Sequence, residues 1–324
     1  MLTVRAMSRA PLAVAYWLGV AGTRTFEAGD DVVFLCHGTP RSLAAPLESQ
    51  LRYLRRTFDL VPLTAIADTA GESRPPARRR RAAIIFDDGL RTNVTVAYPI
   101  LRSLGIPATF FLCPGLIEQR KWIWSREARQ RLRFAGPGLC GELAAEFNAS
   151  PEPEALVQWM KCLHLPDRAL VEARIRQATQ GYVPSSEDCE AFDPADWREL
   201  LEMDPAIITI GSHSMTHPIL PTLSDSAIEM ELRESRRVLE AQFDRPVDLF
   251  SYPNADVDWR VLAAVRKHYR AAVAHSNGTA LDPYLIPSVH LPANVLRLAL
   301  QLNSPPITTP TPARPLAGAG TTAL

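Results

Sequence analysis

The sequence predicts an α/β fold, in which the strands of a parallel sheet or barrel alternate with helices. Short apolar runs of strand length, each closed by turn residues, recur along the chain. Stretches with the apolar spacing of helices separate these runs. The 324 residues are 47% hydrophobic, which is ample for a large core. Because such barrels commonly run to about 250 residues as one unit, we expect one large domain with extensions.

The first half of the chain contains three predicted strands. Residues 32–36 (VVFLC) form the first, residues 82–86 (AAIIF) the second, and the sequence ATFFLC the third. Helical stretches lie between them. The helix after the first strand carries apolar residues at helical spacing, namely Leu47, Leu51 and Leu54. The order strand, helix, strand indicates parallel pairing.

The second half continues the same alternation. Three further strands are predicted in the sequences AIITIG, VDLFSY and YRAAVA. The helix between the first two begins at about Ser224, where Ser226 and Glu229 form a candidate capping pair. No internal repeat interrupts the pattern, so the sequence favours one sheet or barrel over an array of repeated units.

Three regions depart from this alternation. Residues 1–30 are predicted to be an N-terminal helical extension, in which the apolar stretch Ala10–Gly22 is too short for a membrane span of about 20 residues. Residues 31–302 form the main domain, with a helical insertion at about residues 115–195. Residues 303–324 are rich in Pro, Thr, Ala and Gly and are predicted to be a disordered tail.

Composition limits the classes of partner. The 35 basic and 35 acidic residues balance, so the chain lacks the basic footprint of a nucleic-acid-binding protein. Five cysteines, an odd number without paired spacing, fit a reducing compartment and predict a cytoplasmic location. The alternative is export or membrane association through the N-terminal apolar stretch, which has the length of the apolar segment of a secretion signal.

Two carboxylates directly follow the strand at residues 82–86. Asp87 and Asp88 stand before Gly89 in the sequence AAIIFDDG. A buried, unpaired carboxylate costs several kcal/mol, so such a pair is tolerated only where water, an opposite charge or a metal receives it. The stretch therefore predicts a functional site.

Two histidines follow a later strand in the sequence GSHSMTHP. His213 and His217 are four residues apart. In a parallel α/β fold the carboxyl ends of the strands meet on one face, so these histidines should meet Asp87 and Asp88. Two imidazoles and one carboxylate suit a divalent transition metal with open positions for water and substrate. The second carboxylate would be left free to act as a base.

These motifs resemble those of the polysaccharide deacetylases, carbohydrate esterase family four, which include chitooligosaccharide deacetylase-like domains. Phe86 to Gly89 is similar to the first family motif, and His213 to Pro218 to the second. The resemblance extends over about residues 30 to 290 and includes the stretch from Tyr98 to Leu112. Trp197, ahead of the histidine motif, also fits the family pattern.

The resemblance implies a fold and a site. The fold would be a distorted (β/α)7-type barrel of the glycoside hydrolase and deacetylase kind, with a helical insertion. Asp88, His213 and His217 would bind a divalent metal, usually Zn²⁺, and Asp87 would be the general base. The substrate would be an N-acetylated polysaccharide or oligosaccharide, from which the enzyme removes acetyl groups by cleaving a carbon–nitrogen bond outside a peptide.

The third motif departs from the common family pattern. In the sequence FSYPNAD, Ser251 stands where an arginine usually orients the catalytic base. Tyr252, Pro253 and Asn254 are predicted to bind substrate, and a backbone N–H near Asn254 is a candidate donor to the oxyanion. A similar Phe-Ser/Ala-Tyr-Pro version of this motif is found in a branch of the family that is associated with exopolysaccharide. A serine in place of the arginine is therefore compatible with activity.

The general acid has several candidates. The family uses a histidine in a Leu-x-His motif, and the sequence IPSVHLPAN offers His290 without the usual following aspartate. His275 and His37 also stand at predicted strand ends. We predict His290 as the acid and keep the other two as alternatives.

Two aromatic residues of the insertion have two interpretations. Trp122 and Trp124 would either stack on sugars or pack within a helical cap. We favour packing, because tryptophans usually enter cores for the large apolar area that they bury.

The predicted function also has two alternatives. One is a carbohydrate-binding homologue with weak or no turnover, and the other is a hydrolase of a different carbon–nitrogen amide.

Overall fold

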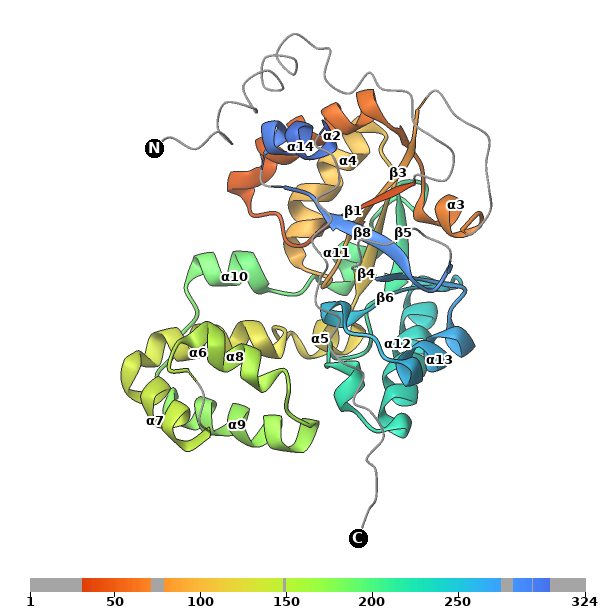
Figure 1. Cartoon of the computed structure of the whole chain (residues 1–324). Helices are drawn as coiled ribbons and strands as arrows, with labels where there is room; N and C mark the ends of the chain where they lie inside the picture. The colour runs from red at the N-terminus through yellow and green to blue at the C-terminus, as the bar shows by residue number, and fades with distance from the viewer. Residues whose placement is uncertain (1–30, 71–78, 148–149, 275–281, 293, 304–324) are drawn as a thin grey trace.

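The structure is a computed structural model of the whole chain. It describes residues 31–70, 79–147, 150–274, 282–292 and 294–303 (Figure 1). The predicted N-terminal extension, nearly all of the predicted tail, and His275 lie outside the described residues, so the predicted domain boundaries stay a prediction. Among the described helices, none is long and apolar enough to cross a membrane.

Seven parallel strands close into a barrel, which confirms the (β/α)7-type fold. They pair in the order β1, β3, β4, β5, β6, β7, β8, and β8 pairs with β1 again. Their bounds are β1 (Val32–Cys36), β3 (Arg81–Phe86), β4 (Ala108–Leu112), β5 (Ile208–Ser212), β6 (Leu249–Ser251), β7 (Ala271–Ala274) and β8 (Ile286–His290). The short strand β2 (Asp59–Leu60) pairs with the start of β3.

The sequence patterns predicted six of the barrel strands but not β8. Its residues, IPSVH, contain a proline and a serine and form no continuous apolar run. The strand is defined by its neighbours, because Phe34 of β1 pairs with Val289 and Val273 of β7 pairs with Ile286. Closure of the barrel, rather than local propensity, therefore makes this segment a strand.

Helices surround the barrel in Figure 1. They are α2 (Ala44–Thr57), α3 (Leu63–Ala67), α4 (Tyr98–Leu104), α11 (Trp197–Leu201), α12 (Asp225–Phe243), α13 (Trp259–His268) and α14 (Val295–Asn303). Short helical turns are η1 (Arg41–Leu43), η2 (Asn93–Ala97), η3 (Leu220–Thr222) and η4 (Pro253–Ala255). The predicted leucines of α2 are buried against β-strand residues such as Phe34. The cap of α12 is Ser224, whose hydroxyl accepts from Ala227 N–H, so the predicted Ser226 capping pair is wrong.

Besides α11, the described residues between β4 and β5 form six helices, four of which build a lobe beside the barrel (Figure 1). The six are α5 (Pro114–Gln119), α6 (Trp124–Ala135), α7 (Pro137–Phe147), α8 (Pro153–Met160), α9 (Leu165–Ala178) and α10 (Ser186–Phe192). The lobe, α6 to α9, packs around an apolar core to which Cys113, Leu116 and Ile219 of neighbouring segments also contribute. Trp124 is buried in that core, and Trp122 donates from its indole N–H to Asp193 at 2.8 Å. The burial of Trp124 and the hydrogen bond of Trp122 support the interpretation that both tryptophans pack within the protein rather than stack on sugars.

Candidate metal centre and active site

The two adjacent aspartates lie at the carboxyl end of β3. Asp87 N–H donates to the carbonyl of Cys36 on β1 at 3.0 Å, so the sheet pairing extends one residue beyond the strand. Asp88 and Gly89 then adopt left-handed φ angles of 73° and 64°. A left-handed aspartate is uncommon and marks a constrained turn. Each aspartate is only 5% exposed, so the turn holds two carboxylates inside the mouth of the barrel.

The two histidines come from the loop after β5. His213 N–H donates to the carbonyl of Leu112 on β4 at 2.9 Å, which fixes the start of the loop. Ser214 and His217 have left-handed φ angles of 64° and 56°, so the chain turns back on itself. The two imidazole rings consequently lie edge to face, with centroids 4.8 Å apart.

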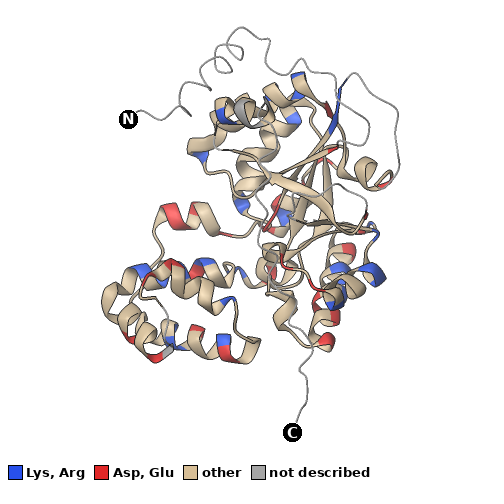
Figure 2. Cartoon of the chain, viewed as in Figure 1, with Lys and Arg blue, Asp and Glu red and all other residues tan. Residues whose placement is uncertain are grey.

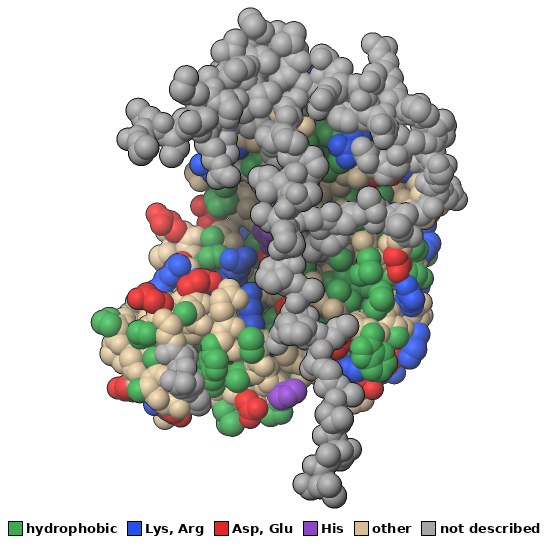
Figure 3. Space-filling view, viewed as in Figure 1, with side chains coloured by type: hydrophobic (Ala, Val, Ile, Leu, Met, Phe, Trp, Pro, Cys, Tyr) green, Lys and Arg blue, Asp and Glu red, His purple; other side chains and the backbone are tan. Residues whose placement is uncertain are grey.

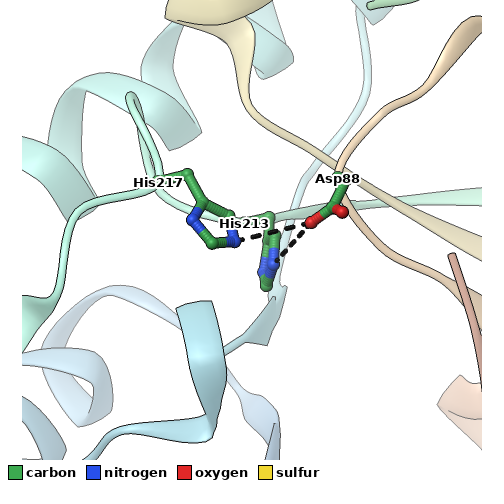
Figure 4. A group of neighbouring side chains, drawn as sticks. All are labelled: Asp88, His213 and His217. Carbon is green, nitrogen blue, oxygen red and sulfur yellow. Dashed lines mark ion pairs between the residues drawn. The ribbon is translucent and has the colours of Figure 1, made fainter. Parts of the chain in front are cut away.

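Asp88, His213 and His217 converge on one point (Figure 4). The Oδ1 atom of Asp88 lies 3.6 Å from Nε2 of His213 and 3.4 Å from Nε2 of His217. All three side chains are buried, and their candidate ligand atoms lie within 4.8 Å of one another. One carboxylate oxygen and two imidazole nitrogens form a donor set that suits a divalent transition metal.

The hydrogen bonds of His213 prepare it as a ligand. Its Nδ1 lies 2.7 Å from the carbonyl oxygen of Ser251, and a carbonyl can only accept, so Nδ1 carries the proton. Nε2 then points its lone pair toward Asp88. A backbone carbonyl behind a ligating histidine commonly fixes the tautomer in this way. Nδ1 of His217 is buried without a partner among the described residues.

The charges of the cluster favour a bound cation. Burial opposes ionisation of Asp88, yet hydrogen bonds with His213 and His217 hold the pKa of its carboxyl well below the usual value. Burial lowers the pKa of His217. Burial also opposes the charge of His213, but Asp87 and Asp88 outweigh it and raise the pKa of that imidazole. A position that attracts a proton between carboxylates would also attract a metal ion, so these residues fit the metal that the family resemblance implies.

Asp87 stands beside the cluster and is held by the third motif. The Ser251 hydroxyl donates to Oδ2 of Asp87 at 2.9 Å, and Nε2 of His213 lies 3.9 Å from the same oxygen. The other oxygen, Oδ1, is buried and has no hydrogen-bond partner among the described residues. Burial is the main reason that the pKa of Asp87 is raised. Ser251 thus orients the carboxylate from the position where the family commonly has an arginine.

A carboxylate on α12 supports the histidine loop. Oε2 of Glu231 accepts from the N–H groups of Met215 and Thr216 at 2.8 and 2.9 Å, and its Oε1 accepts from the Thr216 hydroxyl at 2.7 Å. On the opposite side, Gly115 N–H donates to the Met215 carbonyl at 3.0 Å. A Cβ atom at Gly115 would lie 2.8 Å from that carbonyl oxygen, so only glycine fits. Sequence reasoning missed Glu231, because no local pattern links it to the histidines.

A cavity of about 210 Å³ opens over these groups. Of the residues predicted to bind substrate, Tyr252 and Asn254 line it, whereas Pro253 is buried and is absent from its lining. The Tyr252 hydroxyl donates to the carbonyl of Tyr284 at 3.1 Å. Asn254 and Ala255 have left-handed φ angles of 55° and 59°, so the backbone bends sharply where it meets the cavity.

Two of the three candidate acids meet in the same cavity. His37 follows β1, His290 ends β8, and both side chains line the cavity. Their rings stack with centroids 5.4 Å apart. His37 is partly buried and His290 is exposed. The charge of His37 lowers the pKa of both Asp87 and Asp88, which places it electrostatically close to the cluster.

The barrel and this site define a class of hydrolase whose catalytic residues stand at the carboxyl ends of parallel strands. Residues 74–273 match the profile of the polysaccharide deacetylase family, and the chain belongs to that family. Its members are metal-dependent carbohydrate deacetylases that act on N-acetylated polysaccharides by cleaving carbon–nitrogen bonds outside peptides. The predicted family and enzyme class are thus confirmed. No curated protein matches the chain significantly.

Solved structures share the fold at low sequence identity. A Streptococcus pyogenes deacetylase, PplD, in complex with acetate is 15% identical, with a TM-score of 0.56 over 87% of this chain and 100% of that one. IcaB from Ammonifex degensii is also 15% identical, with a TM-score of 0.57 and the same coverages. The BpsB deacetylase domain from Bordetella bronchiseptica is 13% identical, with a TM-score of 0.51 over 80% of this chain and 95% of that one. These likenesses establish the fold of the chain.

Glu231→Gln tests the support of the histidine loop. A glutamine removes the negative charge from these hydrogen bonds and leaves only one accepting atom for the two backbone N–H groups and the Thr216 hydroxyl, so the loop should loosen and metal affinity should fall about 10- to 100-fold. Titration of the protein with Zn²⁺ against a competing chelator measures this loss. The control is Glu234→Gln on the same helix, since Glu234 pairs with Arg233 and Arg237 instead. Equal affinity in both variants would remove Glu231 from this role.

Proposed function

We propose that the chain is a metal-dependent hydrolase that removes N-acetyl groups from an amino-sugar polymer or oligosaccharide, with zinc as the metal. One observation carries the proposal. The carboxylate of Asp87, with one oxygen unpartnered, stands beside the buried cluster of Asp88, His213 and His217. This arrangement provides a cation site and a separate base within one cavity.

Metal binding, proton acceptance and oxyanion stabilisation fall to different residues of the chain. Asp88, His213 and His217 would hold the divalent ion, which when bound would polarise the acetyl carbonyl and lower the pKa of an attacking water. Oδ1 of Asp87 accepts the proton of that water, while the Ser251 hydroxyl holds Oδ2 in place. The raised pKa of Asp87 suits a base that must take and later release a proton. A backbone N–H near Asn254, which lines the cavity, would donate to the developing oxyanion.

The leaving amine needs an acid, and the stacked pair of His37 and His290 offers one. His290 is the acid expected from the family pattern, and the charge of His37 acts on both aspartates. We therefore propose that the pair supplies the proton, with His37 facing the reacting atoms and His290 stacked behind it. Tyr252 and Asn254 form another part of the cavity lining, where the sugar would bind.

Asp87→Asn tests the base. The variant retains the shape of the side chain but cannot accept the proton, so acetate release from an N-acetylglucosamine oligomer should fall about 10²- to 10⁴-fold. Metal content measured on the same preparation should be unchanged. Release at the rate of the unmodified protein would remove Asp87 as the base. Loss of the metal would show that Asp87 is a ligand instead.

Ser251→Ala tests how the base is held. Losing a hydrogen bond to a charged group should lower kcat about tenfold or more, while KM changes little, because the hydroxyl contacts Asp87 and not the bulk of the substrate. Ser251→Thr keeps the hydroxyl and should restore most of the rate. The backbone carbonyl that binds His213 remains in both variants. Equal rates for Ser251→Ala and the unmodified protein would show that the hydroxyl does not position Asp87.

His37→Gln and His290→Gln test the acid. Removing the true acid should lower kcat for the amide substrate by about 10²-fold or more. Hydrolysis of nitrophenyl acetate should be affected far less, since its leaving group departs without protonation. We expect the larger amide-specific loss in His37→Gln. A larger loss in His290→Gln would return the role to His290, and equal losses on both substrates would exclude an acid role for either residue.

A further inference from the structure

The barrel provides only part of the catalytic cavity, because the helical lobe forms one wall. That wall contains Ile123, Ser125, Arg126, Arg129 and Lys161. Three of these residues are cations. Figure 2 shows basic residues on the border of the lobe that faces the barrel, and Figure 3 shows basic side chains gathered along the same border. A neutral sugar chain would not by itself require this concentration of positive charge.

Lys161 differs from the two arginines in its contacts. It caps the carboxyl end of α8 and is partly buried. Among the described residues its ammonium makes no ion pair within 4.0 Å and no side-chain hydrogen bond. Burial lowers its pKa and the charges of Arg129 and Arg126 lower it further, whereas the charges of Asp256 and Glu154 only partly oppose this shift. A partly desolvated ammonium beside two guanidinium groups is a position where an incoming anion would be stabilised.

The two arginines differ in how they are engaged. Arg129 is bound to Glu154 by two hydrogen bonds of 2.6 and 2.9 Å, so its charge is already neutralised. The nearest carboxylate oxygen to Arg126 is Oδ2 of Asp88, at 3.9 Å, which is too far for a hydrogen bond. A divalent ion bound to Asp88 would compensate that carboxylate and leave Arg126 without an anion.

The acidic side chains in the cavity lining already have roles. Asp87 and Asp88 are the carboxylates of that lining, and the proposed function uses one as base and the other as ligand. Arg126 and Lys161 therefore form a cationic wall that adjoins the proposed metal site. An anion carried by the substrate would complete their charge balance, and an arginine with a lysine suits a carboxylate.

We propose that this wall selects an acidic amino-sugar chain, in which a carboxylate-bearing sugar lies next to the N-acetylated one and binds to Arg126 and Lys161. The inference rests on the proposed function, which supplies the neighbouring acetyl group. The helical lobe thereby acts as a specificity element added to the barrel. Its role is to bind the substrate chain, and it takes no part in the proton transfers.

Binding tests the inference separately from turnover. The zinc-loaded full chain with Asp87→Asn is titrated by calorimetry with two oligosaccharides of equal length. One alternates N-acetylglucosamine with glucuronate, and the other is a neutral chitin oligosaccharide. The acidic one should bind about tenfold more tightly, as expected for one charge-assisted contact, and added salt should reduce the difference. Equal binding, or tighter binding of the neutral chain, would overturn the inference.

Substitutions then test which residues cause the tighter binding of the acidic oligosaccharide. Lys161→Gln and Arg126→Gln, each made in the same background, should reduce the ratio of the two affinities about fivefold to tenfold. Arg133→Gln removes a cation from the same helix as Arg126 but outside the cavity lining, and it should keep the ratio. If Lys161→Gln and Arg126→Gln weakened both ligands equally, the two residues would be ordinary sugar contacts and the inference would fail.

Acetate release by the unmodified enzyme separates this inference from the proposed function. Faster release from the acidic chain supports both. A binding preference without release from either chain supports the cationic wall and counts against the deacetylase. Release from both chains at equal kcat/KM, with equal binding, supports the deacetylase and overturns the selectivity.

Discussion

The structure depends on the burial of two adjacent carboxylates at the end of β3. Taking one such charge out of water costs several kcal/mol unless opposite charges or hydrogen bonds compensate it. Here Asp88 faces two imidazoles, and Asp87 receives the Ser251 hydroxyl. These partners come from the loop after β5 and from the end of β6, which are far from the aspartates in the sequence. The aspartates can therefore be buried only in a closed barrel that brings these strand ends together.

The loops at the barrel mouth also hold unusual backbone. Asp88, Ser214, His217, Asn254 and Ala255 all have left-handed φ angles, and each costs about 1 kcal/mol or more for a residue other than glycine. Contacts from elsewhere maintain these conformations, including the three hydrogen bonds that Glu231 accepts from the histidine loop. Such strained conformations are found where several side chains must point into one site. Here they direct the candidate ligand atoms into the cavity.

Two features set the charge around the candidate base. A serine hydroxyl occupies the place of the usual arginine and holds the base by a hydrogen bond without adding a positive charge. Burial can then keep the pKa of Asp87 raised, as a guanidinium neighbour would not. Positive charge stands instead on the helical lobe, where Arg126 and Lys161 line the cavity. Arg126 approaches Asp88 to 3.9 Å, whereas the hydrogen bond to Asp87 comes from the neutral Ser251 hydroxyl.

The amino-acid sequence by itself determined the alternation of strands and helices and identified Asp87, Asp88, His213 and His217, because strand-end motifs in parallel α/β folds converge on one face. It did not reveal β8, whose residues have weak strand character and pair only because the ring must close. Glu231, the stacking of His37 on His290, and Ser251 as the partner of Asp87 also required the tertiary structure. These contacts join residues far apart in the chain, and local patterns of hydrophobicity contain no information about which distant side chains will meet.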